Sequence, residues 1–68
     1  MLGLPVFRLR QKLILEKLKE CGAVSEESAK TLEEAGVINP NAFPKITEDL
    51  VNKKKLVKTE SQKYYLAY

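Results

Sequence analysis

The densest charge in the chain is a run of three lysines, Lys53, Lys54 and Lys55, followed closely by Lys58 and Lys63. A single cation at the C-terminal end of a helix is enough to interact favourably with the helix dipole, so three exceed that structural role. Ammonium groups at this density attract a polyanion. We therefore treat these five lysines as candidates for anion binding.

The other polar residues do not indicate catalytic chemistry. The chain has no histidine and a single cysteine, Cys21, and it contains no glycine-rich phosphate loop and no nucleophile beside a base at motif spacing. Adjacent carboxylates at 26–27, 33–34 and 48–49 are typical of solvated helix surface. We expect no enzymatic activity, no metal and no cofactor. A lone cysteine also favours a reducing, cytoplasmic location.

A length of 68 residues allows one domain, 1–68, with one small core. The net charge of +3 is unevenly distributed, because residues 1–19 and 45–68 are net positive while residues 20–44 are net negative. The longest uncharged stretch, 35–44, is too short to cross a bilayer, and we therefore expect no membrane association.

The first helix is expected over 6–21, after an apolar arm formed by residues 1–5. Apolar residues recur at spacings of three and four and define one buried face: Val6, Leu9, Leu13, Ile14, Leu18 and Cys21. Gly22 follows as the helix stop.

Residues 25–35 are expected to form a second helix. Ser25 is a suitable N-cap, and two glutamates follow it in the first turn, where the helix dipole favours negative charge. Gly36 ends the helix, and a turn over 37–41 comes next.

A third helix is expected over 41–54, with Pro44 tolerated in its first turn. Its apolar side consists of Phe43, Ile46, Leu50 and Val51. The opposite side carries amides and charges: Asn41, Lys45, Glu48, Asp49 and Asn52.

The last segment, 56–68, is expected to form a β-hairpin. Two β-prone runs, "LVKT" and "KYYLAY", are separated by the short polar connection "ESQ". Tyr64, Leu66 and Tyr68 would share one face of the second strand. Because a two-stranded hairpin is unstable alone, one face should rest on the helices.

This order of elements resembles that of the winged helix-turn-helix proteins, such as small prokaryotic and archaeal transcriptional regulators. "SEESAKTLEEAGV" is similar to the first helix of their helix-turn-helix pair, "NAFPKITEDLV" to the second, and "KKKLVKTESQKYYLAY" to the wing. The resemblance covers about residues 8–68. It departs from the family in a longer inter-helix turn and in Lys55, which stands in place of a glycine. It implies a mainly helical α+β fold with three helices and a C-terminal wing.

The resemblance also implies duplex DNA binding and a role in transcription regulation. The third helix would enter the major groove, where Asn41 and Lys45 near its N-terminus reach base edges and Asn52 shares their face. The lysines at the helix end and wing would contact phosphates. The expected DNA-binding residues are Asn41, Lys45, Asn52, Lys53, Lys54, Lys55, Lys58 and Lys63.

Two adjacent carboxylates, Glu48 and Asp49, weigh against this interpretation because they would repel phosphates on the reading face. Winged-helix domains also occur as protein-interaction modules in multiprotein assemblies, and this alternative stays open. The apolar start of the chain, with Leu2, Leu4 and Phe7, favours it and also favours a homodimer through the N-terminal segment. RNA binding is a further alternative.

Overall fold

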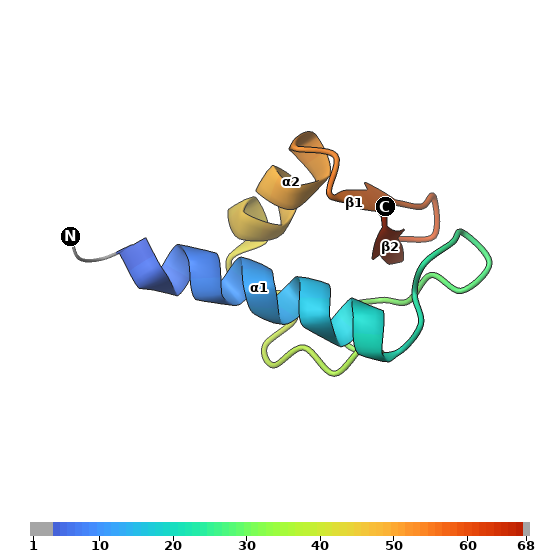
Figure 1. Cartoon of the computed structure of the whole chain (residues 1–68), viewed down its shortest axis with the longest axis horizontal. Coiled ribbons are helices and arrows are strands. Elements are labelled where there is room, and N and C mark those ends of the chain that lie inside the picture. The colour runs from blue at the N-terminus through green and yellow to red at the C-terminus, as the bar shows by residue number, and fades with distance from the viewer. Residues whose placement is uncertain (1–3, 68) are drawn as a thin grey trace.

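The computed structural model describes residues 4–67. Within that range the chain forms two helices and a two-stranded antiparallel sheet. The elements are α1 (Leu4–Glu20), α2 (Pro44–Asn52), β1 (Leu56–Lys58) and β2 (Tyr64–Leu66). α1 runs along the length of the molecule, and α2 and the hairpin lie beside it (Figure 1). The fold is therefore a small, mainly helical α+β domain with two helices rather than the expected three.

α1 ends where the sequence predicts. Gly22 adopts a left-handed φ of 76°, and the Ala23 N–H donates to the Leu18 carbonyl at 2.9 Å. This bond, with the Gly22 N–H donating to the Lys19 carbonyl at 3.1 Å, forms a Schellman motif. The helix begins at Leu4, so the end of the expected apolar arm is helical, and residues 1–3 of that arm lie outside the described residues.

The buried face of α1 is rotated from the expected one. Ile14 and Leu18 are fully buried, but Leu9 is 62% exposed, so its assignment to the buried face is wrong. The half-buried Gln11 lies on the packed side instead and contacts α2. The apolar residues of α1 span a wider part of the helix surface than α2 and the hairpin cover, so some of them remain exposed.

Residues 25–35, all of them described, do not form the expected helix. The Lys30 N–H donates to the Tyr64 carbonyl at 3.0 Å, and the Tyr64 N–H donates to the Lys30 carbonyl at 2.7 Å. Because this bridge to β2 uses the backbone groups that a helix would need, the segment divides into two separate turns. Ser25 caps a turn to Ser28 rather than a helix.

A single helical turn remains after Lys30. The Glu34 N–H donates to Thr31 Oγ1 and the Thr31 N–H donates to Glu34 Oε1, both at 3.0 Å, which is a capping box. The turn closes at Gly36, whose φ is 88°. The cap signal was present in the sequence, but at Thr31 rather than Ser25.

The hairpin is confirmed, and its register is defined by the pairs Leu56↔Leu66, Val57↔Tyr65 and Lys58↔Tyr64. Leu56 and Leu66 are buried, so this end of the hairpin is packed on the helices. The Leu66 N–H donates to the Ala23 carbonyl at 2.9 Å, which ties β2 to the segment after α1.

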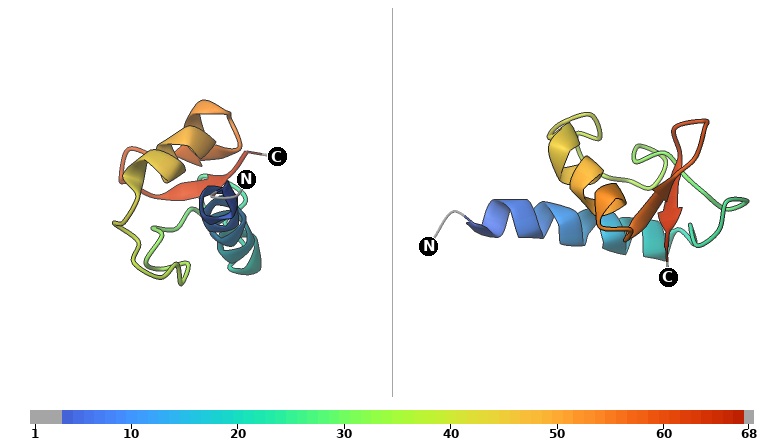
Figure 2. Two further views of the ribbon diagram at one scale, coloured as in Figure 1. Left: turned by 90° about the vertical axis from the view of Figure 1, so that its left-hand side faces the viewer. Right: turned by 90° about the horizontal axis from the view of Figure 1, so that it is seen from above.

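All parts of the fold contribute to one core. α2 and the hairpin lie on the same side of α1 (Figure 2). Apolar side chains from these elements pack into one buried cluster. The buried cluster consists of Ile14, Leu18, Ala23, Leu32, Ala35, Val37, Leu50, Leu56 and Leu66. This core fixes α2 and the hairpin relative to each other.

Candidate nucleic-acid interface

The outer face of α2 carries three exposed polar residues, Lys45, Glu48 and Asn52, which we call the α2 strip. Their spacings of three and four place them on one side of the helix. Ile46 and Leu50 are buried on the opposite side. The helix predicted over 41–54 is thus present in a shorter form, and two of the expected DNA-binding residues, Lys45 and Asn52, share its exposed face.

Asp49 is directed toward α1 and away from the α2 strip. Gln11 Nε2 donates to Asp49 Oδ2 at 2.9 Å, and Lys53 Nζ lies 2.9 Å from the same oxygen. The ion pair with Lys53, followed by the hydrogen bond from Gln11, lowers the pKa of Asp49. The expected pair of adjacent carboxylates on one reading face is therefore wrong, because Asp49 is engaged elsewhere and Glu48 alone remains there.

A groove separates α2 from the hairpin, and Tyr64 lines it. One hollow of about 140 Å³ is lined by Glu48, Val51, Asn52, Lys58 and Tyr64. A second, of about 170 Å³, is lined by Leu32, Pro40, Asn41, Pro44, Thr47, Glu48, Lys58 and Tyr64. Because the two share Lys58 and Tyr64, we describe them as one Tyr64 groove, which brings Asn41, Asn52 and Lys58 to one surface.

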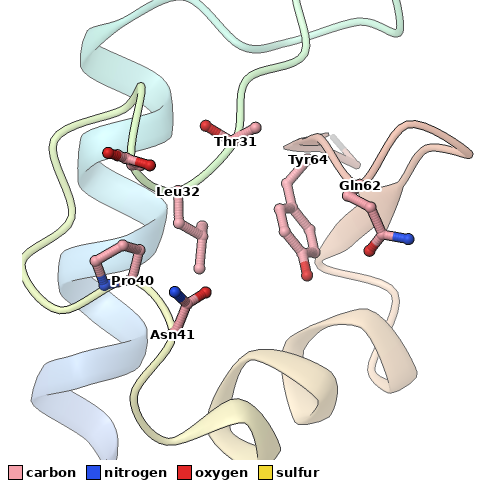
Figure 3. Close-up of a pocket in the computed structure, with 7 residues that line it drawn as sticks. Thr31, Leu32, Pro40, Asn41, Gln62 and Tyr64 are labelled. Carbon is pink, nitrogen blue, oxygen red and sulfur yellow. The ribbon is translucent and has the colours of Figure 1, made fainter.

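A third hollow, of about 290 Å³, extends the Tyr64 groove toward the turn at Thr31. Tyr64 projects from β2 toward Leu32 and Asn41, which come from the other side of the hollow (Figure 3). Asn41 precedes α2 in a loop, and its side chain is exposed. The wall thus combines an aromatic ring with amide and hydroxyl groups.

Strand register decides which hairpin lysine reaches this groove. Lys58 pairs with Tyr64 across the strands, so both side chains lie on the groove face. Lys63 lines a different hollow, of about 280 Å³, together with Glu26, Glu27 and Glu60. The structure therefore does not bring Lys63 together with the other candidate residues, and its surroundings are acidic.

The run of three lysines forms the turn that ends α2. The Lys55 N–H donates to the Leu50 carbonyl at 2.9 Å and the Lys54 N–H to the Val51 carbonyl at 3.0 Å, which is a second Schellman motif. Lys54 occupies the left-handed position of this motif, with φ of 63°. The position at which glycine would be favoured is therefore Lys54, and not Lys55 as expected. All three side chains are exposed, and Lys53 is paired with Asp49.

The loop before α2, residues 38–43, is held by Arg10 and is here called the clamped loop. Arg10 Nη1 donates to the Ile38 carbonyl at 2.6 Å, and Nη2 donates to the Asn39 carbonyl at 2.7 Å. The guanidinium carbon lies 5.9 Å from the centroid of the Phe43 ring. Sequence reasoning missed both Arg10 and Phe43 as neighbours of the site, because a contact between residues so distant in sequence leaves no local signal.

Across residues 4–67 there is no group of three or more histidine, cysteine, aspartate or glutamate side chains arranged to hold a metal ion. Among the helices described, neither has both the length and the apolar character needed to cross a membrane. Comparisons with protein-family models, with curated proteins and with solved structures found no match.

Proposed function

We propose that this protein binds duplex DNA through the α2 strip, the turn at the end of α2 and the groove-facing residue of β1, and that it acts in transcription regulation. The observation that carries the proposal is that Asn52, which shares the exposed face of α2 with Lys45, lines one hollow together with Lys58 of β1. Amide and ammonium groups are the donors and acceptors that proteins use on base edges and phosphates.

In the proposed complex the N-terminal half of α2 enters the major groove. Asn41 and Lys45 approach base edges there, while Glu48 can accept a hydrogen bond from a cytosine amino group. Lys54 and Lys55, at the other end of α2, contact phosphates without regard to sequence. The direction of Asp49 toward α1 supports this arrangement, because it removes one of two negative charges from the approaching face.

The hairpin takes the part of a wing in this proposal. Lys58 points from β1 into the Tyr64 groove beside Asn52, and contacts the backbone next to the bases under α2. Lys63 is left out of the contact surface, because the carboxylates of Glu26, Glu27 and Glu60 around it repel phosphates. The fold would then be a reduced winged helix in which the turn at Thr31 replaces the first helix of the helix-turn-helix pair.

A second candidate function is protein binding. It is favoured by large apolar side chains that remain exposed at Leu9, Ile38 and Phe43, with exposed fractions of 62%, 70% and 57%. A homodimer through the N-terminal segment belongs to this second candidate, although residues 1–3 of that segment lie outside the described range.

The deciding experiment is a map of backbone amide shifts on titration with a mixed-sequence DNA duplex at moderate salt. We expect shifts in 41–58, with those of Lys45, Asn52 and Lys58 among the largest. Shifts confined to α1, or none in a folded protein, would reject DNA binding through α2 and favour the protein-binding function.

A matched pair of variants sharpens this experiment. Lys58→Ala removes a groove-facing lysine and should weaken duplex binding, whereas Lys19→Ala removes an exposed lysine of α1 and should leave it unchanged. Equal losses in the two variants would indicate a general effect of net charge rather than a defined surface.

A further inference from the structure

Phe43 adopts a backbone conformation that is costly for its residue type. It is the N-cap of α2 and has φ of 53° and ψ of 55°, in the left-handed region. Bulky residues rarely adopt this region, and glycine or asparagine does so at lower cost. The residue is also 57% exposed, so burial does not offset the strain. Strain of this kind is found where surrounding structure holds a residue in place for a function.

Arg10 contacts the ring of Phe43, and Pro44 restricts the backbone beside it. Pro44 occupies the first position of α2 and restricts the backbone at the start of the helix. The Arg10 guanidinium lies over the ring at 5.9 Å from its centroid, and Arg10 is itself fixed by the Ile38 and Asn39 carbonyls. The ring is therefore supported by Arg10 while more than half of the residue remains open to a partner.

The sequence neighbours of Phe43 are of types that bind nucleic acids. The segment 35–47 contains no acidic residue, and Phe43 stands between Asn41 and Lys45. Both of those side chains are exposed and can hydrogen-bond base edges or phosphates. An apolar ring beside them matches thymine, which presents a methyl group in the major groove as well as a hydrogen-bond acceptor.

We propose that Phe43 is a specificity-determining residue that packs against the 5-methyl group of thymine. This inference rests on the proposed function, because it requires the N-terminal end of α2 to face the major groove. It adds to that function a preference that the lysines alone cannot provide, since phosphate contacts carry no sequence information.

The test compares two A·T-rich duplexes of identical sequence, one with thymine and the other with uracil at every such position. Wild-type protein should bind the uracil duplex about fourfold more weakly, the factor expected for burying one methyl group. Phe43→Asn, which removes the ring and tolerates the left-handed conformation, should bind both duplexes equally. Leu9→Asn is the matched control, because it removes an exposed apolar side chain from α1 and should retain the fourfold difference.

Thermal unfolding of Phe43→Asn separates a binding role from a structural one. The variant should be at least as stable as the wild type, because asparagine relieves the strain. A large loss of stability would overturn the inference by showing that the ring is needed for the fold.

The binding outcomes separate the inference from the proposed function. Equal binding of the two duplexes by the wild type would overturn the role of Phe43 but leave DNA binding intact. A fourfold difference that persists in Phe43→Asn would also overturn it, since the methyl groups would then act elsewhere or through duplex shape. No binding to either duplex would reject the proposed function together with the inference, and would favour the protein-binding function instead.

Discussion

Gln11 of α1 donates one hydrogen bond from Nε2 to Asp49 of α2 at 2.9 Å, and the same nitrogen lies 3.2 Å from the Ile46 carbonyl. This polar contact joins the two helices at the edge of the core. It also sets the direction of the Asp49 carboxylate, which reaches Lys53 at 2.9 Å. The contact therefore affects both the stability of the helix pair and the charge of the surface proposed to meet DNA.

Two carboxylates should make the free energy of unfolding depend on pH in the acid range. Asp49 has a lowered pKa because of Lys53 and then Gln11, and Glu34 has a lowered pKa because of its hydrogen bond from the Thr31 backbone. Groups of this kind contribute stability at pH values above the pKa of the unfolded chain, and that contribution is lost as pH falls through the lower pKa of the folded protein. The free energy of unfolding should therefore decrease below about pH 4.

Urea unfolding at neutral pH and in the acid range measures this effect. Asp49→Asn should show a smaller decrease than the wild type, because the variant has no charge to lose at that position. Glu48→Gln is the matched control, since among residues 4–67 Glu48 forms no ion pair, and it should retain the decrease. An unchanged decrease in Asp49→Asn would contradict the role given to the contact.

Arg10 is predicted to stabilise the clamped loop through its two short hydrogen bonds to carbonyl groups. Arg10→Ala should lower the free energy of unfolding by about 2 kcal/mol, the decrease expected for hydrogen bonds made by a charged group. Arg10→Lys should restore less than half of it, because lysine lacks the planar fork that reaches two carbonyls. Denaturant unfolding measures both, with Arg8→Ala, an exposed α1 arginine, expected to change stability by less than about 0.5 kcal/mol. Full recovery of stability in Arg10→Lys would contradict the importance of the two hydrogen bonds made by the guanidinium group.

The protein is predicted to be less stable with lysine than with glycine at position 54. Lys54→Gly should raise the free energy of unfolding by about 1 kcal/mol, because φ of 63° is strained for lysine and free of strain for glycine. Lys55→Gly removes the neighbouring lysine and gains no such relief, so it should be neutral or destabilising. A gain of the same size in both variants would show that charge repulsion within the run, rather than backbone strain, sets the stability.

The salt dependence of duplex binding should distinguish the three lysines of the run. Replacing Lys54 and Lys55 together by alanine should weaken binding to all sequences and flatten the slope by about 0.9 for each phosphate that the protein no longer neutralises. Lys53→Ala should have a smaller effect, because Lys53 is paired with Asp49. An unchanged slope in the double variant would exclude the run as a phosphate anchor.

Replacing Lys45 should affect DNA binding in a different way from replacing the three lysines at the end of α2. Lys45→Ala is expected to change the sequence preference as well as the affinity, because Lys45 lies near the N-terminus of α2, the end that we propose to face base edges. Affinities measured on a panel of duplexes test this. An equal loss of affinity on every duplex would make Lys45 a phosphate-binding residue instead.

Much of the site follows from local sequence pattern. Helical spacing predicted that Lys45 and Asn52 share one face of α2, and strand alternation predicted that Tyr64 and Leu66 share one face of β2. The contribution of Lys58 required the strand register, which places it opposite Tyr64. The contact between Arg10 and Phe43 could not be predicted, because no short-range rule relates α1 to the loop before α2.

By itself, the sequence determined α1, α2 and the hairpin, because each has a local apolar or β-prone pattern, and Gly22 also marks the end of α1. Only the tertiary structure decided the conformation of residues 25–35 and the direction of the Asp49 side chain. Lys30 exchanges backbone hydrogen bonds with Tyr64, and a bond to a distant strand outweighs the small helix propensity of a short segment. Asp49 likewise faces whichever partner the packing of two helices provides, and that partner is Gln11.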